Sequence, residues 1–305
     1  MIKAAIDVGS NSVLLLVEQY QDGKWHVIHE NTYITALGKH TKQTGLLQEE
    51  SVKDTLKALK QAFSEARHHG ANEILAGVTM AARIAKNADD FLERAKNQAT
   101  PIQILTGDQE AELGFFATAA DPLFSKHPIL TTIDIGAQST EIVTGRQNNH
   151  SWEILFKKSY PVGALGLRAD ILSSESPDLL ARKHAANEMD EFFAFPYQGK
   201  DAGTAVTLGA TGTNLISIFK KMTIWQPSLV HGVYLSEDQL KQMIMTLFNL
   251  TDAGRSALVG IEPGREFTLH IGALILNQIL YKLHIQGCLV SVRGWRHAFL
   301  EMPNL

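Results

Sequence analysis

Two short segments of this sequence place a carboxylate, a glycine and small polar residues in the order typical of anion-binding turns. They read Ile6-Asp7-Val8-Gly9-Ser10-Asn11-Ser12 and Ile133-Asp134-Ile135-Gly136-Ala137-Gln138-Ser139, and Thr140 and Glu141 follow the second. An aspartate that ends a strand directs its carboxylate away from the sheet, and a tight turn after it lets successive backbone N–H groups point at an anion. Such a carboxylate can also bind Mg²⁺ or its waters. The two segments therefore predict binding of phosphate and a divalent cation.

The two segments form an internal repeat, because they match at the Ile, Asp, Gly and Ser positions. Each follows one expected strand and precedes another, so duplication of a β-meander with a following βα unit accounts for both. The alternative is a pair of ordinary hairpins with Asp-Gly turns. Finding the same turn in both halves favours the phosphate-binding interpretation.

A third glycine-containing turn, Leu208-Gly209-Ala210-Thr211-Gly212-Thr213, separates an expected strand from a helix expected to begin near Asn214. Unpaired N–H groups at a helix start face any nearby anion, which allows contact with a nucleotide or a phosphate chain. Glycine at such a junction equally serves close packing of the helix on the strand. The sequence leaves both interpretations open.

Two further acidic residues lie near the start of regular elements. Thr106 and Gln109 have capping-box spacing, so Glu110 lies in a first helical turn, where a carboxylate stays ionised and can accept a proton from water. The alternative for Glu110 is a favourable helix-end charge alone. Glu141 would face away from Asp134 on a straight strand, but the turn between them resets the alternation and leaves its direction open.

Other catalytic motifs are absent from the sequence. There is no GxSxG, CxxC, HExxH or GxxxxGK[ST] pattern, which leaves serine-hydrolase, zinc and P-loop interpretations without support. The 12 histidines are scattered along the chain. The single cysteine, Cys288, lies in an apolar run and is expected to be a small core residue.

The elements expected to position these groups divide the chain into two halves of similar order. The first half should contain a meander of strands 2–7, 13–18 and 25–31, then helix 49–66, strand 73–78, helix 89–96, strand 101–105 and helix 108–119. The second should repeat the meander at 129–134, 140–144 and 152–159, then continue with helices within 163–195, strand 204–208 and mainly helical sequence. This order predicts an α/β fold with mixed sheets covered by helices. Prolines 122 and 128 mark 121–128 as the linker candidate.

Length and composition agree with a two-domain protein. The 305 residues exceed what one core usually serves, and the 45% hydrophobic share is that of a globular chain. One cysteine indicates a reducing, cytoplasmic setting. No apolar stretch approaches the ~18 residues of a membrane span, and a net charge of -4 gives no basic surface for nucleic acid. We therefore expect no DNA or membrane partner, and local groups must bind any polyanion.

In their order and spacing, segments along nearly the whole chain resemble the exopolyphosphatase and guanosine pentaphosphate phosphatase (Ppx/GppA) family. These segments are AAIDVGSNSVLLLV from Ala4, VTMAARIAKN from Val78, LTGDQEAELGFFATA from Leu105, TTIDIGAQSTEIVTG from Thr131, YPVGALGL from Tyr160, LGATGTNLISI from Leu208, VHGVYLSEDQL from Val230, GALIL from Gly272 and SVRGWRHAFL from Ser291. The resemblance implies the short family form, with two ribonuclease-H-like domains of the actin, hexokinase and Hsp70 superfamily and a cleft between them. The domains would be 1–122 and 123–305, with the last helix, about 294–305, packing on the first.

The resemblance also implies an activity and roles for individual residues. The activity is Mg²⁺- or Mn²⁺-dependent removal of the terminal phosphate from polyphosphate or guanosine pentaphosphate, by a protein that is commonly a homodimer. Glu110 resembles the base that activates water, Arg83 a phosphate-contacting arginine, and Asp134 with Glu141 the acidic pair that holds the metal. The phosphate-binding positions are Asp7, Gly9, Ser10, Asn11 and Ser12 in the first loop, Gly136, Ala137, Gln138, Ser139 and Thr140 in the second, and Gly209, Thr211, Gly212 and Thr213 in the third.

The sequence departs from the family pattern most clearly in the second loop, where D-I-G-G-G-S-T-E becomes a segment with Ala137 and Gln138 in place of two glycines. If these positions needed φ > 0 or close backbone approach to phosphate, the side chains would strain the loop or block the ligand, at about 1 kcal/mol or more each. Other departures are Ile84, Glu112, Arg265-Glu266-Phe267 and the closing S-D-x-G-L-R-E-G, which becomes Ser291-Val292-Arg293-Gly294-Trp295-Arg296-His297-Ala298.

The acidic residues of the pattern all remain, which favours hydrolysis. Two alternatives stay open. The loss of the glycines fits a polyphosphate or nucleotide sensor that binds without turnover. A phosphotransferase of the same superfamily would need an acceptor pocket, for which the sequence carries no separate signal.

Overall fold

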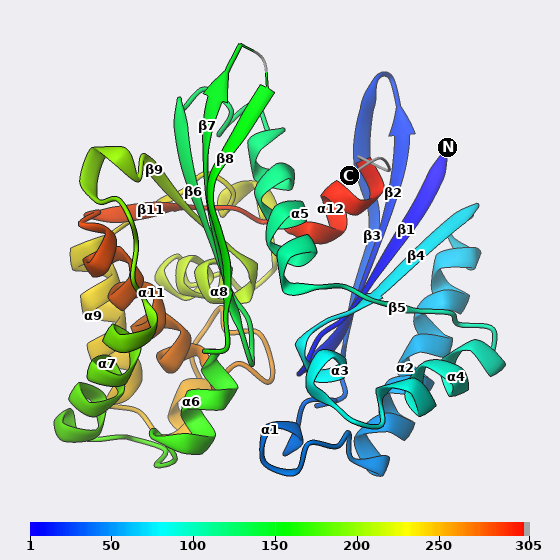
Figure 1. The fold of residues 1–305 in the computed structure, drawn as a ribbon, viewed down its shortest axis with the longest axis horizontal. Coiled ribbons are helices and arrows are strands. Elements are labelled where there is room, and N and C mark those ends of the chain that lie inside the picture. Colours follow the sequence, from blue (N-terminus) through cyan, green and yellow to red (C-terminus); the bar gives the residue numbers. More distant parts are fainter. Residues whose placement is uncertain (150, 302–305) are drawn as a thin grey trace. The chain divides into compact units, whose positions relative to one another are not determined.

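The computed structural model describes residues 1–149 and 151–301, and their contacts divide the chain into two compact units (Figure 1). Unit 1 comprises Met1–Leu113 together with the helical segment Trp295–Glu301, and unit 2 is Gly114–Gly294. The division falls inside helix α5 (Gly107–Ala119), earlier in the chain than residue 122. The reason is that the segment after α5 packs within unit 2, where the Phe124 side chain is completely buried. The segment 121–128 is therefore a packed part of unit 2 rather than a free linker.

Unit 1 is built on a five-stranded mixed sheet of order β3-β2-β1-β4-β5. Its strands are β1 (Ile2–Val8), β2 (Ser12–Gln21), β3 (Lys24–Ile34), β4 (Glu73–Val78) and β5 (Gln103–Ile104). The first three form the predicted antiparallel meander, whereas β4 runs parallel to β1 and β5 parallel to β4. Strand β5 is shorter than the expected strand 101–105, because only Gln103 and Ile104 pair with β4.

The two faces of this sheet are covered by different helices. The helices of this part of unit 1 are α1 (Thr41–Thr44), α2 (Glu49–His68), α3 (Met80–Ile84) and α4 (Ala88–Asn97). Ala4 and Ile6 of β1 join the core formed with α2 and α4, whereas Ala5 packs with Leu300 of α12 (Trp295–Glu301). Because side chains alternate along a strand, Asp7 lies on the same face as Ala5, the one covered by α12.

Unit 2 contains a six-stranded sheet of order β10-β11-β9-β6-β7-β8. Its strands are β6 (Ile129–Ile135), β7 (Thr140–Asn148), β8 (Ser151–Tyr160), β9 (Thr204–Leu208), β10 (Tyr234–Ser236) and β11 (Gly287–Val290). Strands β6, β7 and β8 repeat the antiparallel meander, and β9 is parallel to β6. The expectation of mainly helical sequence after β9 is wrong at β10 and β11. These strands are too short to show a period, and β11 pairs with the distant β9.

The helices of unit 2 surround one buried helix. They are α6 (Ala164–Asp170), α7 (Leu179–Phe192), α8 (Gly209–Phe219), α9 (Glu237–Phe248), α10 (Asp252–Ser256) and α11 (Leu269–Leu283), with 3-10 turns at Gly199–Asp201 and Pro227–Leu229. Most of α11 is buried, and Ile133 and Ile142 of the sheet join its core, as does Cys288. On the other face of the sheet, Phe115 of α5 packs on Gly145, where a Cβ atom would lie 2.3 Å from the ring.

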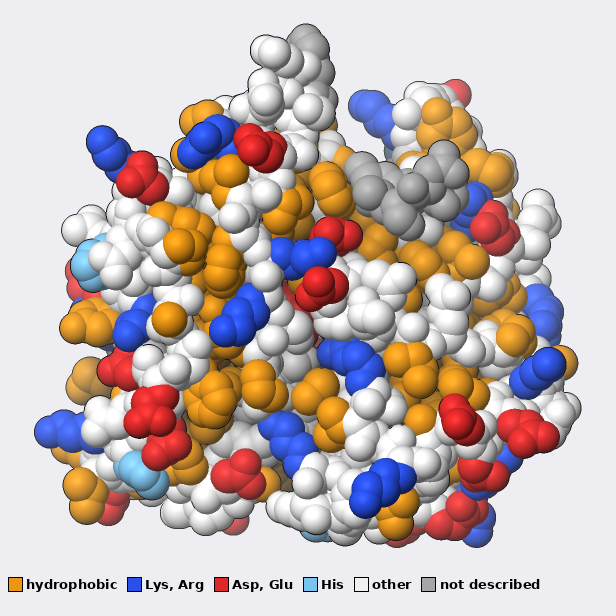
Figure 2. All heavy atoms as spheres, in the orientation of Figure 1, with side chains coloured by type: hydrophobic (Ala, Val, Ile, Leu, Met, Phe, Trp, Pro, Cys, Tyr) orange, Lys and Arg blue, Asp and Glu red, His pale blue; other side chains and the backbone are white. Residues whose placement is uncertain are grey.

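Across the described chain, every helix is too short or too polar to cross a membrane. On the face drawn in Figure 2, Lys and Arg side chains are interspersed with Asp and Glu rather than gathered into one basic surface. A polyanion would therefore be bound by local groups, since no broad positive field is present on this face.

Candidate functional site

The two predicted turns have the same geometry. In each, the glycine N–H donates to the serine carbonyl, Gly9 to Ser12 at 2.9 Å and Gly136 to Ser139 at 2.8 Å. The preceding strands, β1 and β6, share one burial pattern in which the aspartate is the partly exposed position near the end. The sequence repeat is therefore also a repeat of structure.

The apex of each turn presents backbone N–H groups. Within the described residues, the amides of Ser10 and Asn11 in the first turn donate no hydrogen bond, and the same holds for Ala137 and Gln138 in the second. Successive N–H groups that lack an internal acceptor form the kind of concavity that binds phosphate oxygens. The local geometry thus suits the anion-binding role predicted for both turns.

Each turn is supported by a glycine that the sequence analysis did not single out. Gly38 donates to the Ser10 carbonyl at 2.7 Å, and a Cβ atom on Gly38 would lie 2.6 Å from that of Ser10. In unit 2, a Cβ atom on Gly163 would lie 2.5 Å from the Ala137 carbonyl, and Leu165 donates to that carbonyl at 2.8 Å. The available signal was a glycine shortly after the third strand of each meander.

The two substitutions in the second turn do not strain its backbone. Neither Ala137 nor Gln138 has a positive φ angle, so the first of the two conditions under which they would cost energy is not met. The turn takes its shape from the Gly136–Ser139 hydrogen bond and from the support of α6. Gln138 is 6% exposed, and its Oε1 atom has no hydrogen-bond partner among the described residues. A buried acceptor of this kind calls for a ligand or a water.

Replacing both residues with glycine should therefore destabilise the protein. We expect Ala137→Gly and Gln138→Gly each to lower the free energy of unfolding by about 0.4–1 kcal/mol, because glycine adds freedom to the unfolded chain. Ala99 has φ of 60°, so Ala99→Gly is the matched control and should leave stability unchanged or raise it. Urea unfolding gives the free energy of unfolding of all three variants. A gain in stability in the turn variants would show that their side chains are strained after all.

The acidic pair of unit 2 is assembled by strand register. Asp134 of β6 lies directly opposite Glu141 of β7, and Glu141 lies opposite Ser159 of β8. Directly opposite residues of antiparallel strands share a face, which settles the direction that the sequence left open. Ser159 Oγ donates to Glu141 Oε1 at 2.6 Å and was not among the predicted residues.

These oxygen atoms fit one class of metal site. Mg²⁺ is usually held by one or two carboxylates and completes its shell with waters and substrate phosphates. Among the described residues, no three or more His, Cys, Asp or Glu side chains gather as a metal site. Asp134 and Glu141 supply two carboxylates, the number usual for a cation that is shared with substrate phosphates. Their metal-binding role stays a prediction.

The third glycine-containing segment is a helix rather than a turn. Helix α8 begins at Gly209, not near Asn214, so Thr211, Gly212 and Thr213 lie inside it. A Cβ atom on Gly212 would lie 2.5 Å from Thr207 Cγ2, and the Thr213 hydroxyl donates to the Gly209 carbonyl at 3.3 Å. Packing on β9 thus overrides the weak helix propensity of this stretch. At the start of this helix, a Cβ atom on Gly209 would lie 2.8 Å from Asp134 Oδ1, an oxygen of the acidic pair.

Thr140 also has a structural hydrogen bond. The residue is completely buried, and its hydroxyl donates to the Val162 carbonyl at 2.6 Å. The bond ties β7 to the chain just before α6. This use of its proton reduces what Thr140 can offer a phosphate.

In unit 1, the structure brings Arg83 and Glu110 together. Thr106 and Gln109 form the predicted capping box, with Thr106 Oγ1 accepting from Gln109 N at 3.1 Å and Gln109 Oε1 accepting from Thr106 N at 2.9 Å. Arg83 of α3 donates through Nη1 to Glu110 Oε2 at 2.8 Å and to the Leu105 carbonyl at 2.8 Å. The two side chains are only 15% and 13% exposed. Burial raises the pKa of the Glu110 carboxyl, while the guanidinium acts in the opposite direction.

Comparisons with known proteins agree with this geometry. Residues 16–301 match the Ppx/GppA phosphatase family. Exopolyphosphatase 2 of Mycobacterium tuberculosis is 28% identical over 313 aligned positions, which cover 98% of this chain and 96% of that protein. The solved structure of the Aquifex aeolicus member of the Ppx/GppA family is 28% identical, with a TM-score of 0.83 over 98% of this chain and 96% of that one.

A further solved structure supports the fold alone. An exopolyphosphatase from Cytophaga hutchinsonii has a TM-score of 0.87 at 21% identity, over 98% of this chain and 96% of that one. The predicted fold class, two ribonuclease-H-like domains of the actin, hexokinase and Hsp70 superfamily, is confirmed by these neighbours.

Proposed function

Because the chain belongs to the Ppx/GppA phosphatase family, we propose that it hydrolyses the terminal phosphoanhydride bond of inorganic polyphosphate, of guanosine pentaphosphate, or of both. Its relatives include proteins named exopolyphosphatases, which favours polyphosphate as the first substrate to test. The proposed cofactor is Mg²⁺ or Mn²⁺.

The observation that carries the proposal is the largely buried Glu110 carboxylate at the start of α5, paired with Arg83. A base works best when its pKa lies near the working pH, and burial moves the pKa of Glu110 upward from its ordinary value. In the proposed reaction, Glu110 takes the proton of the water that attacks the terminal phosphorus. The phosphoanhydride bond then breaks, orthophosphate leaves, and the shortened chain keeps the bridging oxygen.

Arg83 has two roles in this proposal. Its Nη1 atom holds Glu110 in place, whereas Nη2 lies 3.8 Å from the Met80 sulfur, a weak acceptor. A phosphate oxygen would be a much better partner for Nη2, since charge-assisted hydrogen bonds are roughly twice as strong as neutral ones. The guanidinium would thereby orient the base and stabilise charge on the phosphoryl group.

In this proposal, each unit contributes its own phosphate-binding groups. We assign the N–H groups of Ser10, Asn11, Ala137 and Gln138 to phosphate oxygens, and the carboxylates of Asp134 and Glu141 to the cation. A bound Mg²⁺ would neutralise phosphate charge and help the leaving oxygen depart. The alternative of a sensor without turnover gains no support from backbone strain, because neither Ala137 nor Gln138 has a positive φ angle.

One assay tests the proposal as a whole. We expect the purified protein to release orthophosphate from long-chain polyphosphate or guanosine pentaphosphate when Mg²⁺ or Mn²⁺ is present, and not when EDTA is added. ATP, with and without a phosphate acceptor such as glucose or acetate, is the control. Saturable binding of polyphosphate without release would identify a sensor, and ADP formed only with an acceptor would identify a kinase.

A further inference from the structure

A tryptophan reaches the carboxylate that precedes the first turn. Trp295, the first residue of α12, donates from its indole Nε1 to Asp7 Oδ2 at 3.1 Å. Both residues belong to unit 1, and Trp295 is 4% exposed. Trp295 stands where the family pattern has a leucine. A leucine has no group that could donate to Asp7.

The surroundings of the indole are built to let it reach Asp7. Gly77 of β4 lies beside Asp7 in the parallel register of the sheet. A Cβ atom on Gly77 would lie 2.7 Å from Leu105 Cδ1 and 3.1 Å from Trp295 Cη2, so a side chain there would displace Leu105 and crowd the indole. Phe299, one turn further along α12, packs against the indole ring at a centroid distance of 5.5 Å. The ring is therefore held by contacts on several sides.

We propose that Trp295 is a positioning residue for Asp7, an inference that rests on the proposed function. The torsion that rotates a carboxylate has broad minima, so an aspartate at a strand end is not oriented by its rotamer alone. A hydrogen bond to a charged group is stronger than a neutral one and fixes the oxygen that accepts it. The indole thus restricts the orientation of the Asp7 carboxylate, which comes just before the turn of Ser10 and Asn11. Asp7 then presents a pre-oriented oxygen to a divalent cation or to its waters.

Trp295→Phe tests this role, because it keeps an aromatic ring in the pocket and removes the N–H donor. We expect kcat for phosphate release to fall about tenfold, the scale of one lost hydrogen bond to a charge, while KM changes little. The far-UV circular dichroism spectrum should match that of the wild type, and the thermal midpoint should lie within a few degrees of the wild-type value. Trp25→Phe on β3 is the matched control and should leave kcat unchanged. A Trp295→Phe enzyme with wild-type kcat would overturn the inference.

A direct readout separates this inference from the proposed function. In protein labelled with ¹⁵N at the indoles, the Trp295 N–H signal should move in Asp7→Asn and on addition of Mg²⁺ with inorganic phosphate, while the Trp25 signal stays in place. If the wild type released no phosphate, the proposed function would fall and this signal would decide the inference alone. A Trp295 signal indifferent to both changes would show that the indole does not orient Asp7.

Discussion

Glu110→Gln is expected to lower the rate of phosphate release by about 10²- to 10⁴-fold, the usual contribution of a general base. The amide has the same shape but cannot accept the proton of the attacking water. Binding of substrate should change much less than kcat, because the turns and the acidic pair are untouched. Phosphate release from polyphosphate at saturating substrate and Mg²⁺ gives the comparison.

The control for this variant is Glu112→Gln, two residues further along the same helix. It removes an equal charge from α5, and we expect it to change kcat by less than about threefold, because Glu112 has no role in the proposed mechanism. Equal losses in Glu110→Gln and Glu112→Gln would mean that the charge of α5 matters and not the base. Undiminished turnover in Glu110→Gln would remove Glu110 from the mechanism, while leaving phosphatase activity itself in place.

The pH dependence of activity should carry the same signature. Burial raises the pKa of Glu110, and only the ionised carboxylate acts as base. Activity should therefore rise with pH on the acid side, with a midpoint above the ordinary glutamate value near 4.5. Arg83→Met removes the charge that opposes the shift, so its acid limb should move to higher pH. An acid limb in Arg83→Met at or below the wild-type pH would contradict the ion pair.

Local sequence patterns were sufficient for the meanders, the paired turns and the capping box before α5. Their signals lie within a few residues, as in the strand-turn-strand order around Asp7. The features that were missed depend on strand register and packing rather than on residue types at a given spacing. The face on which Glu141 lies follows from the register of β6 and β7. The start of α8 follows from the packing of Gly212 on Thr207. The proposed role of Trp295 depends on the absence of a side chain at Gly77. A single sequence contains no direct record of such contacts.

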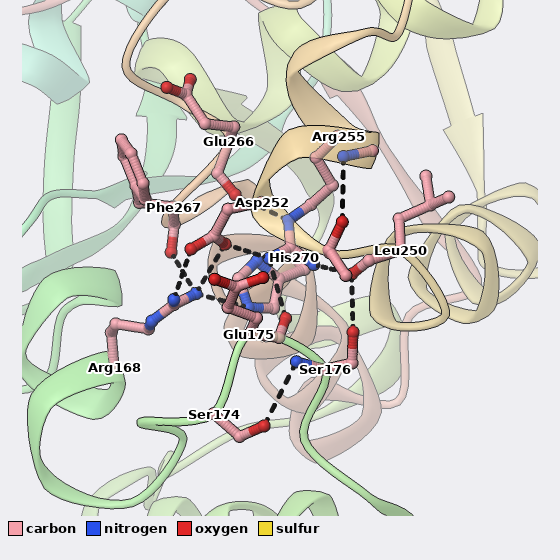
Figure 3. A network of polar contacts seen from close by, with 12 residues as sticks. Arg168, Ser174, Glu175, Ser176, Leu250, Asp252, Arg255, Glu266, Phe267 and His270 are labelled. Carbon is pink, nitrogen blue, oxygen red and sulfur yellow. Dashed lines mark hydrogen bonds and ion pairs between the residues drawn. The ribbon is translucent and has the colours of Figure 1, made fainter.

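The second large effect concerns stability and lies in a buried charge network of unit 2 (Figure 3). Arg168 of α6 makes two hydrogen bonds to Asp252, at 3.1 and 2.8 Å, and Arg255 contacts Asp252 as well. Arg255 is completely buried and also donates to the carbonyls of Leu247 and Leu250. One carboxylate therefore balances two guanidinium groups that hold several loops together.

Asp252→Asn should lower the free energy of unfolding by about 3–5 kcal/mol, because it removes the carboxylate that forms ion pairs with both guanidinium groups. Asp90→Asn is the control, since its 3.4 Å pair with Arg94 is on the surface and should change stability by less than about 1 kcal/mol. Urea unfolding at neutral pH measures both. Equal effects would show that the buried network adds nothing beyond an ordinary surface pair.

The same network predicts how the stability of the wild-type protein depends on pH. Burial raises the pKa of Asp252, but the hydrogen bonds from Arg168 and Arg255 together outweigh this effect. The pKa of Asp252 in the folded protein is therefore below its ordinary value. A lowered carboxyl pKa stabilises the fold above the unfolded value and loses that contribution as pH falls through the folded value. Burial and the nearby Arg255 also lower the pKa of His270 to about 3 from 6.5, so protons favour the unfolded state below about pH 6.5.

Loss of this network should reach the phosphate turn as well. Arg168 lies on α6, and Leu165 of the same helix donates to the Ala137 carbonyl in the second turn. If Asp252→Asn loosens α6, affinity for phosphate should weaken at temperatures where the protein is still folded, and KM should rise more than kcat falls. A variant that is destabilised but keeps the wild-type KM would show that the network supports the fold of unit 2 without setting the geometry of the Gly136–Ser139 turn.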